Sequence, residues 1–124
     1  MKQNLIWRAW HNSLPSKCNL LRQTIISEQI CDRCKEDNED FVHSVWSCKE
    51  LDGVWGMNDI WSFRNQQSFS NFSELLAWVF QHQRNPDLFA FTVSSIWHQR
   101  NQVRTQQAYR PLNQLSQLAH DRYA

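Results

Sequence analysis

The stretch CDRCKEDNEDFVHSVWSC, residues 31–48, decides how this chain folds, because it places Cys31, Cys34, His43 and Cys48 at the spacing C-x2-C-x8-H-x4-C. Two cysteines separated by two residues lie on one turn, so their sulfur atoms can bind one ion. A histidine and a third cysteine complete the Cys3His ligand set of a structural zinc site. Four protein ligands leave no coordination position for water, so we expect one structural Zn²⁺. The alternative is that the cysteines are buried thiols and the histidine lies on the surface.

The composition favours a mostly α fold. The chain has 124 residues with only two Gly and three Pro, and it has no long alternation of β-branched residues. We expect a small zinc-stapled helical module, a Cys3His knuckle, over residues 1–56, followed by a helical extension over residues 57–124. Cys18 lies outside the ligand set, and no chemistry in the sequence requires it.

The apolar spacing predicts helices near residues 5–11, 16–23, 39–46, 72–80, 86–103 and 112–119. Residues 24–30 are expected to be extended, and residues 57–70 to form a loop. Asn38 is expected to cap the third helix, and Ser70 or Asn71 the fourth. On a regular helix His43 and Cys48 lie about 140° apart. We therefore expect Cys48 to come from a frayed or tightened last turn.

Large apolar residues predict where the core lies. Helical spacing places several of them on two facing stripes around the metal, and these are Trp7, Trp10, Leu14, Leu21, Trp46 and Trp55. The alternative is that one or two of the tryptophans are surface rings.

The charges are unevenly distributed, although the net charge is only +1. Residues 1–30 and 91–124 each carry +3, whereas residues 31–48 carry −3. Because phosphate neutralisation supplies most of the affinity for nucleic acid, the acidic loop is disfavoured as a contact. The flanking helices offer the candidate phosphate contacts, which are Arg8, Lys17, Arg22, Arg100 and Arg104. The alternative is that these charges form ordinary solvated helix faces.

The acidic residues do not form the clusters that DNA polymerases or RNases H need. Both activities use carboxylates that hold metal ions, whereas this sequence has no Asp-Asp pair and concentrates its acids near the cysteines. A nucleophile pair of Cys18 and His11 has no evident orienting group. We therefore expect no enzymatic activity.

The sequence has no apolar run of about 18 residues and no apolar stretch typical of a signal peptide at its N-terminus. We expect an intracellular protein with no membrane partner. In that reducing environment, clustered cysteines bind metal more often than they form disulfides.

Two stretches resemble a known family. The run LIWRAWHNSLP at residues 5–15, together with the cysteine and histidine pattern and Trp55, resembles the zinc-binding module that follows the polymerase domain in plant LINE-type, non-LTR retrotransposon reverse transcriptases. The run IWHQRNQVR at residues 96–104 resembles the W-x-x-R-N segment that joins this module to an RNase H-like domain. The family has a proline after the first cysteine, where this chain has Asp32.

The resemblance implies a non-catalytic fragment of an RNA-directed DNA polymerase, with the adjacent polymerase and RNase H domains as its partners and the nucleus as its location. Its role would be structural, or an auxiliary one in binding RNA or DNA. The alternative is a helical protein-interaction fragment in which zinc is purely structural. Salt-dependent binding to single-stranded RNA distinguishes the two.

Overall fold

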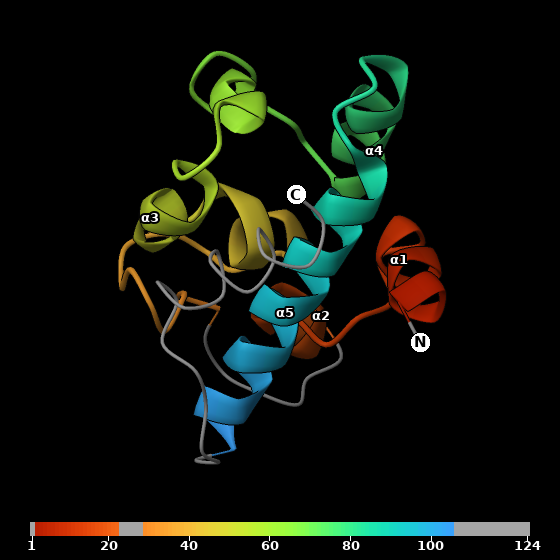
Figure 1. The fold of residues 1–124 in the computed structure, drawn as a ribbon. Helices are drawn as coiled ribbons and strands as arrows, with labels where there is room; N and C mark the ends of the chain where they lie inside the picture. The colour runs from red at the N-terminus through yellow and green to blue at the C-terminus, as the bar shows by residue number, and fades with distance from the viewer. Residues whose placement is uncertain (1, 23–28, 106–124) are drawn as a thin grey trace.

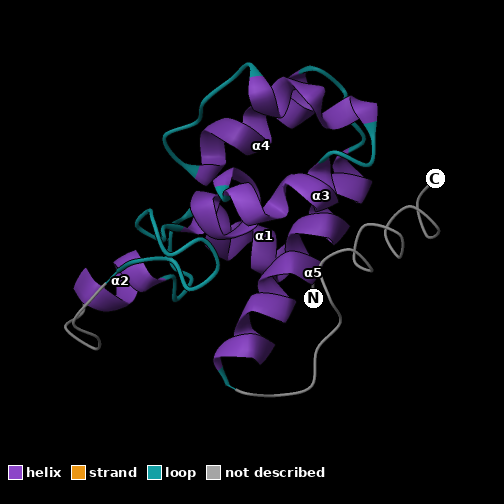
Figure 2. Ribbon diagram, turned by 90° about the vertical axis from the view of Figure 1, so that its left-hand side faces the viewer, coloured by secondary structure: helices purple, strands orange, loops and turns teal. Residues whose placement is uncertain are grey.

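The computed structural model describes residues 2–22 and 29–105, which form helices joined by loops (Figures 1 and 2). The α-helices are α1 (Lys2–Trp10), α2 (Lys17–Arg22), α3 (Asp52–Trp55), α4 (Phe72–Gln81) and α5 (Pro86–Arg104). The shorter pieces are a π-helix, η1 (His43–Ser47), and two 3-10 helices, η2 (Lys49–Leu51) and η3 (Asp59–Asn65). The described ranges contain no β-strand, although an isolated antiparallel bridge joins Ile30 to Asn38. The predicted mostly helical fold is confirmed.

Helices α4 and α5 begin at asparagine caps. Asn71 accepts a hydrogen bond from the Glu74 N–H at 3.0 Å, and the Glu74 carboxylate accepts one from the Ser70 N–H at 2.7 Å. Asn85 accepts a hydrogen bond from the Leu88 N–H at 3.3 Å, and a proline occupies the first turn, where its missing N–H costs nothing. The predicted starts of both helices are confirmed, with Asn71 as the cap of α4.

Helix α5 runs through the middle of the molecule and contacts η1, α1 and α4 (Figure 1). Its side chains Phe89, Val93 and Ile96 are completely buried. One hydrophobic cluster extends from Ala9 to Trp97 and includes residues on both sides of position 56. A shared core does not locate a domain boundary, so the division into residues 1–56 and 57–124 stays a prediction.

Aromatic rings fill the centre of this core. The ring of Trp46 lies 4.7 Å from that of Trp55, 5.2 Å from that of Phe63 and 6.0 Å from that of Phe89, measured between centroids. Leu14, Trp46 and Trp55 are buried, as the sequence predicts. Leu21 is half-buried.

The expectation that Trp7 and Trp10 belong to the core is wrong, because they are 61% and 48% exposed. Helix α1 packs against α4 and α5 through Ala9, with Leu5 and Ile6 partly buried beside it. These three positions share one face of a helix, so residue 7 falls on the opposite face and residue 10 at its edge.

The expected loop over residues 57–70 contains the helix η3. The Asn58 side chain caps this helix by accepting a hydrogen bond from the Ile60 N–H at 3.1 Å. Trp61 and Phe63 are each only 4% exposed. The spacing of these two rings is not that of an amphipathic α-helix, and burial of the rings stabilises a tighter, shorter helix instead.

Two expectations fall outside the described residues: the final helix over residues 112–119 and most of the extended segment over residues 24–30. In the part of the chain that the structure describes, no helix combines the length and the apolar character needed to cross a bilayer.

Candidate metal centre

Backbone hydrogen bonds close the loop that carries Cys31 and Cys34. The Cys31 N–H donates to the Asp37 carbonyl at 2.8 Å, and the Lys35 N–H donates to the Cys31 carbonyl at 3.0 Å. Lys35 has a φ of 61°, which reverses the chain directly after the second cysteine. Both sulfur atoms are thereby held on one side of the loop.

His43 and Cys48 come from the two ends of η1. The helical turn begins at Phe41, and the Asp40 carboxylate caps it by accepting a hydrogen bond from the His43 N–H at 2.7 Å. The expectation that Asn38 caps this helix is wrong. Asn38 instead pairs with Ile30 and closes the cysteine loop.

The turn between His43 and Cys48 is widened rather than tightened. The Cys48 N–H donates to the His43 carbonyl at 3.1 Å, a bond that spans five residues and defines a π turn. A wider turn rotates less per residue, so Cys48 returns to the side of the helix on which His43 lies. The expectation of a frayed or tightened turn is therefore wrong in direction, although an irregular turn is present.

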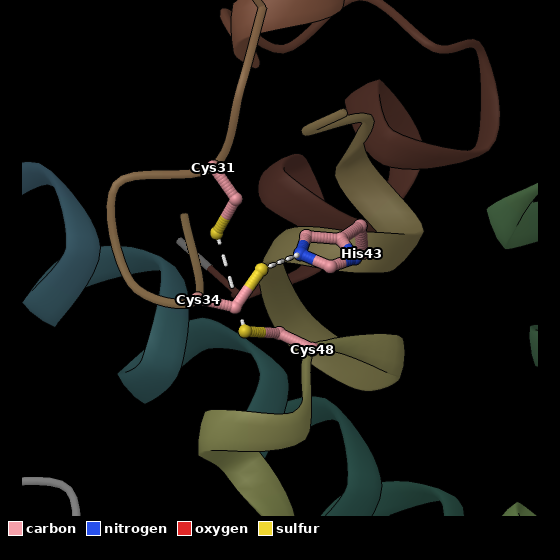
Figure 3. A group of neighbouring side chains, drawn as sticks. All are labelled: Cys31, Cys34, His43 and Cys48. Atoms are coloured by element: carbon pink, nitrogen blue, oxygen red, sulfur yellow. Dashed lines mark hydrogen bonds between the residues drawn. The ribbon is translucent and has the colours of Figure 1, made fainter. Parts of the chain in front are cut away.

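The four predicted ligands converge (Figure 3), and their donor atoms all lie within 4.8 Å of one another. The Cys31 and Cys48 sulfur atoms are 4.0 Å apart, and the Cys34 sulfur lies 3.4 Å from the His43 Nε2. Tetrahedral zinc with Zn–S of about 2.3 Å and Zn–N of about 2.0 Å requires an S···S separation of about 3.8 Å and an S···N separation of about 3.5 Å. All four residues are buried and the cysteines are not in disulfides. The donor set and its spacing fit a zinc ion.

Neighbouring groups shift the protonation of Cys31, His43 and Cys48. A hydrogen bond with Cys48 acts most strongly on Cys31 and lowers the pKa of its thiol to about 3. The same bond, together with burial, raises the pKa of Cys48 above the usual thiol range. Burial lowers the pKa of His43, but hydrogen bonds with Cys31 and Cys34 outweigh it and raise that pKa to about 9. A metal ion that binds all four donors therefore displaces protons from His43 and Cys48.

Arg64 on η3 holds the backbone next to the last ligand. Its Nε donates to the Trp46 carbonyl at 2.7 Å, and its Nη2 donates to the Cys48 carbonyl at 2.9 Å. Its Nη1 also pairs with Asp52 at 2.6 Å. No local sequence pattern indicates this role for Arg64, because the cysteine whose carbonyl it binds lies 16 positions earlier.

Arg33 and Glu39 also have roles that no local sequence pattern indicates, because both connect the cysteine loop to other elements. Arg33 donates to the Ser44 carbonyl at 2.6 Å and to the side chain of Gln99 on α5 at 3.0 Å.

Glu39 is 3% exposed. Its carboxylate accepts a hydrogen bond from the Lys17 N–H at 2.9 Å and forms an ion pair with Arg100. Its acidic side chain reads in the sequence as part of a solvated loop, and only the tertiary structure reveals its burial.

The candidate nucleic-acid contacts lie in different environments. Lys17 and Arg100 are 7% and 5% exposed and form ion pairs with Asp32, at 2.7 Å, and with Glu39. Their charged groups therefore stabilise the fold and offer little surface to phosphate. Arg8 on α1 is exposed, and Arg104 at the end of α5 is half-buried. The side chain of Arg22 lies outside what the structure describes.

Several acidic side chains between the metal ligands are paired with cations, which the sequence alone does not indicate. Glu36 pairs with Lys49 at 2.7 Å, Asp32 pairs with Lys17, and Glu39 is buried against Arg100. These pairs offset much of the negative charge that the sequence places between the ligands.

Comparison with known proteins adds one finding. Residues 1–55 match a family model described as zinc-binding in reverse transcriptase. No curated protein and no solved structure matches the chain.

Proposed function

We propose, from the premise that residues 1–55 form a zinc-binding module of the reverse-transcriptase type, that this chain is a non-catalytic part of such an enzyme and holds one structural zinc ion. The observation that carries the proposal is the convergence of Cys31, Cys34, His43 and Cys48 in a buried cluster. Four protein donors complete a tetrahedron and exclude water and substrate from the metal. By resemblance, the parent protein would be a plant LINE-type reverse transcriptase that acts in the nucleus beside its polymerase and RNase H domains.

Metal analysis of the purified chain tests this proposal. We expect one equivalent of zinc, and we expect Co²⁺ substitution to give the absorption of a tetrahedral thiolate site. Cys34→Ser should lower the zinc content and change the Co²⁺ spectrum, because it removes a ligand. Cys18→Ser is the matched control and should keep both. Full zinc content in Cys34→Ser, or no zinc in the unaltered chain, would contradict the proposal.

An auxiliary contact with single-stranded nucleic acid is the role that the exposed face of α1 supports. Trp7 and Trp10 are 61% and 48% exposed, and Arg8 and His11 are exposed beside them. The His11 ring lies 4.2 Å from the Trp7 ring, between centroids. Exposed aromatic rings next to a cation can stack bases and contact phosphate without reading sequence.

Titration with a fluorescent single-stranded RNA at several salt concentrations tests this role. With Arg8, Arg22 and Arg104 as the remaining candidate phosphate contacts, we expect a slope of log K against log salt of about −2. Trp10→Ala should weaken binding by about 5- to 100-fold, which is the effect of removing one stacked base. Phe80→Ala is the matched control, because Phe80 is 59% exposed on a different helix.

Each result of this titration decides between the two roles. Equal losses in Trp10→Ala and Phe80→Ala would reject α1 as the contact surface. No binding at low salt would favour the alternative role, in which the exposed α1 face contacts another protein and zinc is purely structural.

A further inference from the structure

Arg33 stands between two metal ligands in the sequence, and its side chain reaches two other parts of the fold, η1 and α5. It follows Cys31 by two positions and precedes Cys34 by one, so any movement of the cysteine turn moves its backbone. Its Nη1 donates to the Ser44 carbonyl at 2.6 Å. Because Ser44 follows His43 directly, this one side chain joins the turn that carries two ligands to the helix that carries the third.

The other side of the same guanidinium rests on α5. Its Nη2 donates to the Ile96 carbonyl at 3.3 Å and to the Gln99 Oε1 at 3.0 Å. Ile96 is completely buried and Gln99 is 6% exposed, so both acceptors belong to a packed helix surface. A guanidinium bound by three acceptors has little freedom to move, since each bond constrains the planar group further.

Charge favours this placement. Zinc bound by three thiolates and an imidazole carries one net negative charge. Arg33 is half-buried, and a cation beside that centre is stabilised by it, as the centre is in turn.

A second connection runs parallel to the first. Arg100 on α5 forms a buried ion pair with Glu39, and the Nε–Oε2 distance is 3.1 Å. A pocket of about 160 Å³ lies between the cysteine loop and α5, and its lining includes Arg33, Gln99 and Arg100. Water can enter this pocket, so a water molecule can partly replace a lost acceptor of Arg33.

We propose that Arg33, held by Ile96 and Gln99, couples helix α5 to the metal ligands. The packing of α5 against the cysteine loop then sets the affinity for zinc. The inference rests on the proposed zinc binding, and it extends the metal site to a helix beyond residues 1–55. Arg33 acts as a positioning residue: it fixes the cysteine turn against the histidine helix and contacts the metal only through them. Coupling between two sites is reciprocal, so zinc must stabilise the docked α5 by the same factor.

The experiment measures zinc affinity by competition with a chromophoric chelator in the full chain. Gln99→Ala removes one acceptor of Arg33 without touching a ligand, and we expect a loss of affinity of about 3- to 10-fold. Arg33→Lys keeps the charge but loses the planar fork, and we expect a loss of about 10- to 100-fold, as for other residues that orient metal ligands. Gln99→Glu keeps an acceptor for Arg33 and should restore affinity to within about 2-fold of the unaltered chain.

Gln102→Ala is the matched control, because Gln102 lies three positions further along α5 and outside these contacts. It should change the affinity by less than about 2-fold. The Co²⁺ absorption spectrum is the second readout: Arg33→Lys should shift it, because the ligand geometry changes, whereas a purely structural role would leave it unchanged.

The outcomes separate this inference from the proposed function. Affinities within 2-fold of the unaltered chain for both Gln99→Ala and Arg33→Lys overturn the inference and leave zinc binding standing. An equal loss in Gln102→Ala also overturns it, because the effect is then not specific to the Arg33 contact. Absence of zinc from the unaltered chain overturns both.

Discussion

The carboxylate of Glu39 and the guanidinium of Arg100 form an ion pair between the cysteine loop and α5, across 61 positions of sequence. The two side chains are 3% and 6% exposed, and the Arg100 guanidinium also lies 4.5 Å from the centre of the Trp97 ring. A charge buried to this degree is tolerated only with its partner in place. The pair therefore constrains how α5 lies on the cysteine loop.

Removal of one partner of this pair should be costly. We expect Glu39→Gln to lower the free energy of unfolding by about 3 kcal/mol, because Arg100 then remains buried without a counter-charge. Urea unfolding of the zinc-loaded chain measures the loss. Lys49→Ala is the control: it breaks the exposed Lys49–Glu36 pair, and its unfolding curve should coincide with that of the unaltered chain. A similar curve for Glu39→Gln would show that the buried pair contributes nothing.

The tryptophans divide into core and surface, and their substitutions should differ accordingly. Trp46 is 2% exposed and packs against three aromatic rings. Trp46→Ala should cost about 3–5 kcal/mol of stability, because it leaves a large cavity. Trp7→Ala should cost less than about 0.5 kcal/mol, because that ring is largely in solvent. Equal losses, measured by denaturant unfolding, would contradict the packing of α1.

The hydrogen bonds from Arg64 to the backbone should contribute more to the stability of the fold than its ion pair with Asp52. Arg64→Ala leaves the Trp46 and Cys48 carbonyls without their charged donor, and we expect a loss of about 2–3 kcal/mol. Asp52→Ala removes only a partner that is 70% exposed, and should cost less than about 1 kcal/mol. Thermal unfolding of both variants with bound zinc compares them. A larger loss in Asp52→Ala would assign the role to the ion pair instead.

Zinc affinity should rise with pH across the neutral range. The metal needs neutral imidazole and thiolate, whereas hydrogen bonds with Cys31 and Cys34 raise the pKa of His43 to about 9. The proton on His43 is therefore present below about pH 9 and competes with the metal, so affinity falls as the pH falls. Cys31, with its pKa lowered to about 3, does not contribute to this competition in the neutral range. Chelator competition at pH 6, 7 and 8 measures the slope, and a pH-independent affinity would contradict the ligand set.

Local sequence determined the ligand set and the long helices. The spacing of Cys31, Cys34, His43 and Cys48 needed no tertiary information, because two residues between cysteines place both sulfurs on one turn. The cap of α4 at Asn71, one of the two predicted positions, was local in the same way, since a capping side chain bonds to an N–H only three residues away. Both signals act over a few positions, where the sequence specifies the geometry directly.

Tertiary structure decided the rest. The helical pattern of α1 permits two apolar faces, and only packing against α4 and α5 selected Ala9 for burial and left Trp7 in solvent. The π turn places Cys48 beside His43 while the residues between them stay buried in the core. No regular helical periodicity in the sequence predicts such a turn. Arg33, Glu39 and Arg64 act through partners 11 to 66 positions away, the nearest being Ser44 and the farthest Gln99. Burial and pairing of such charges depend on which surfaces meet, so they arise only once the chain has folded.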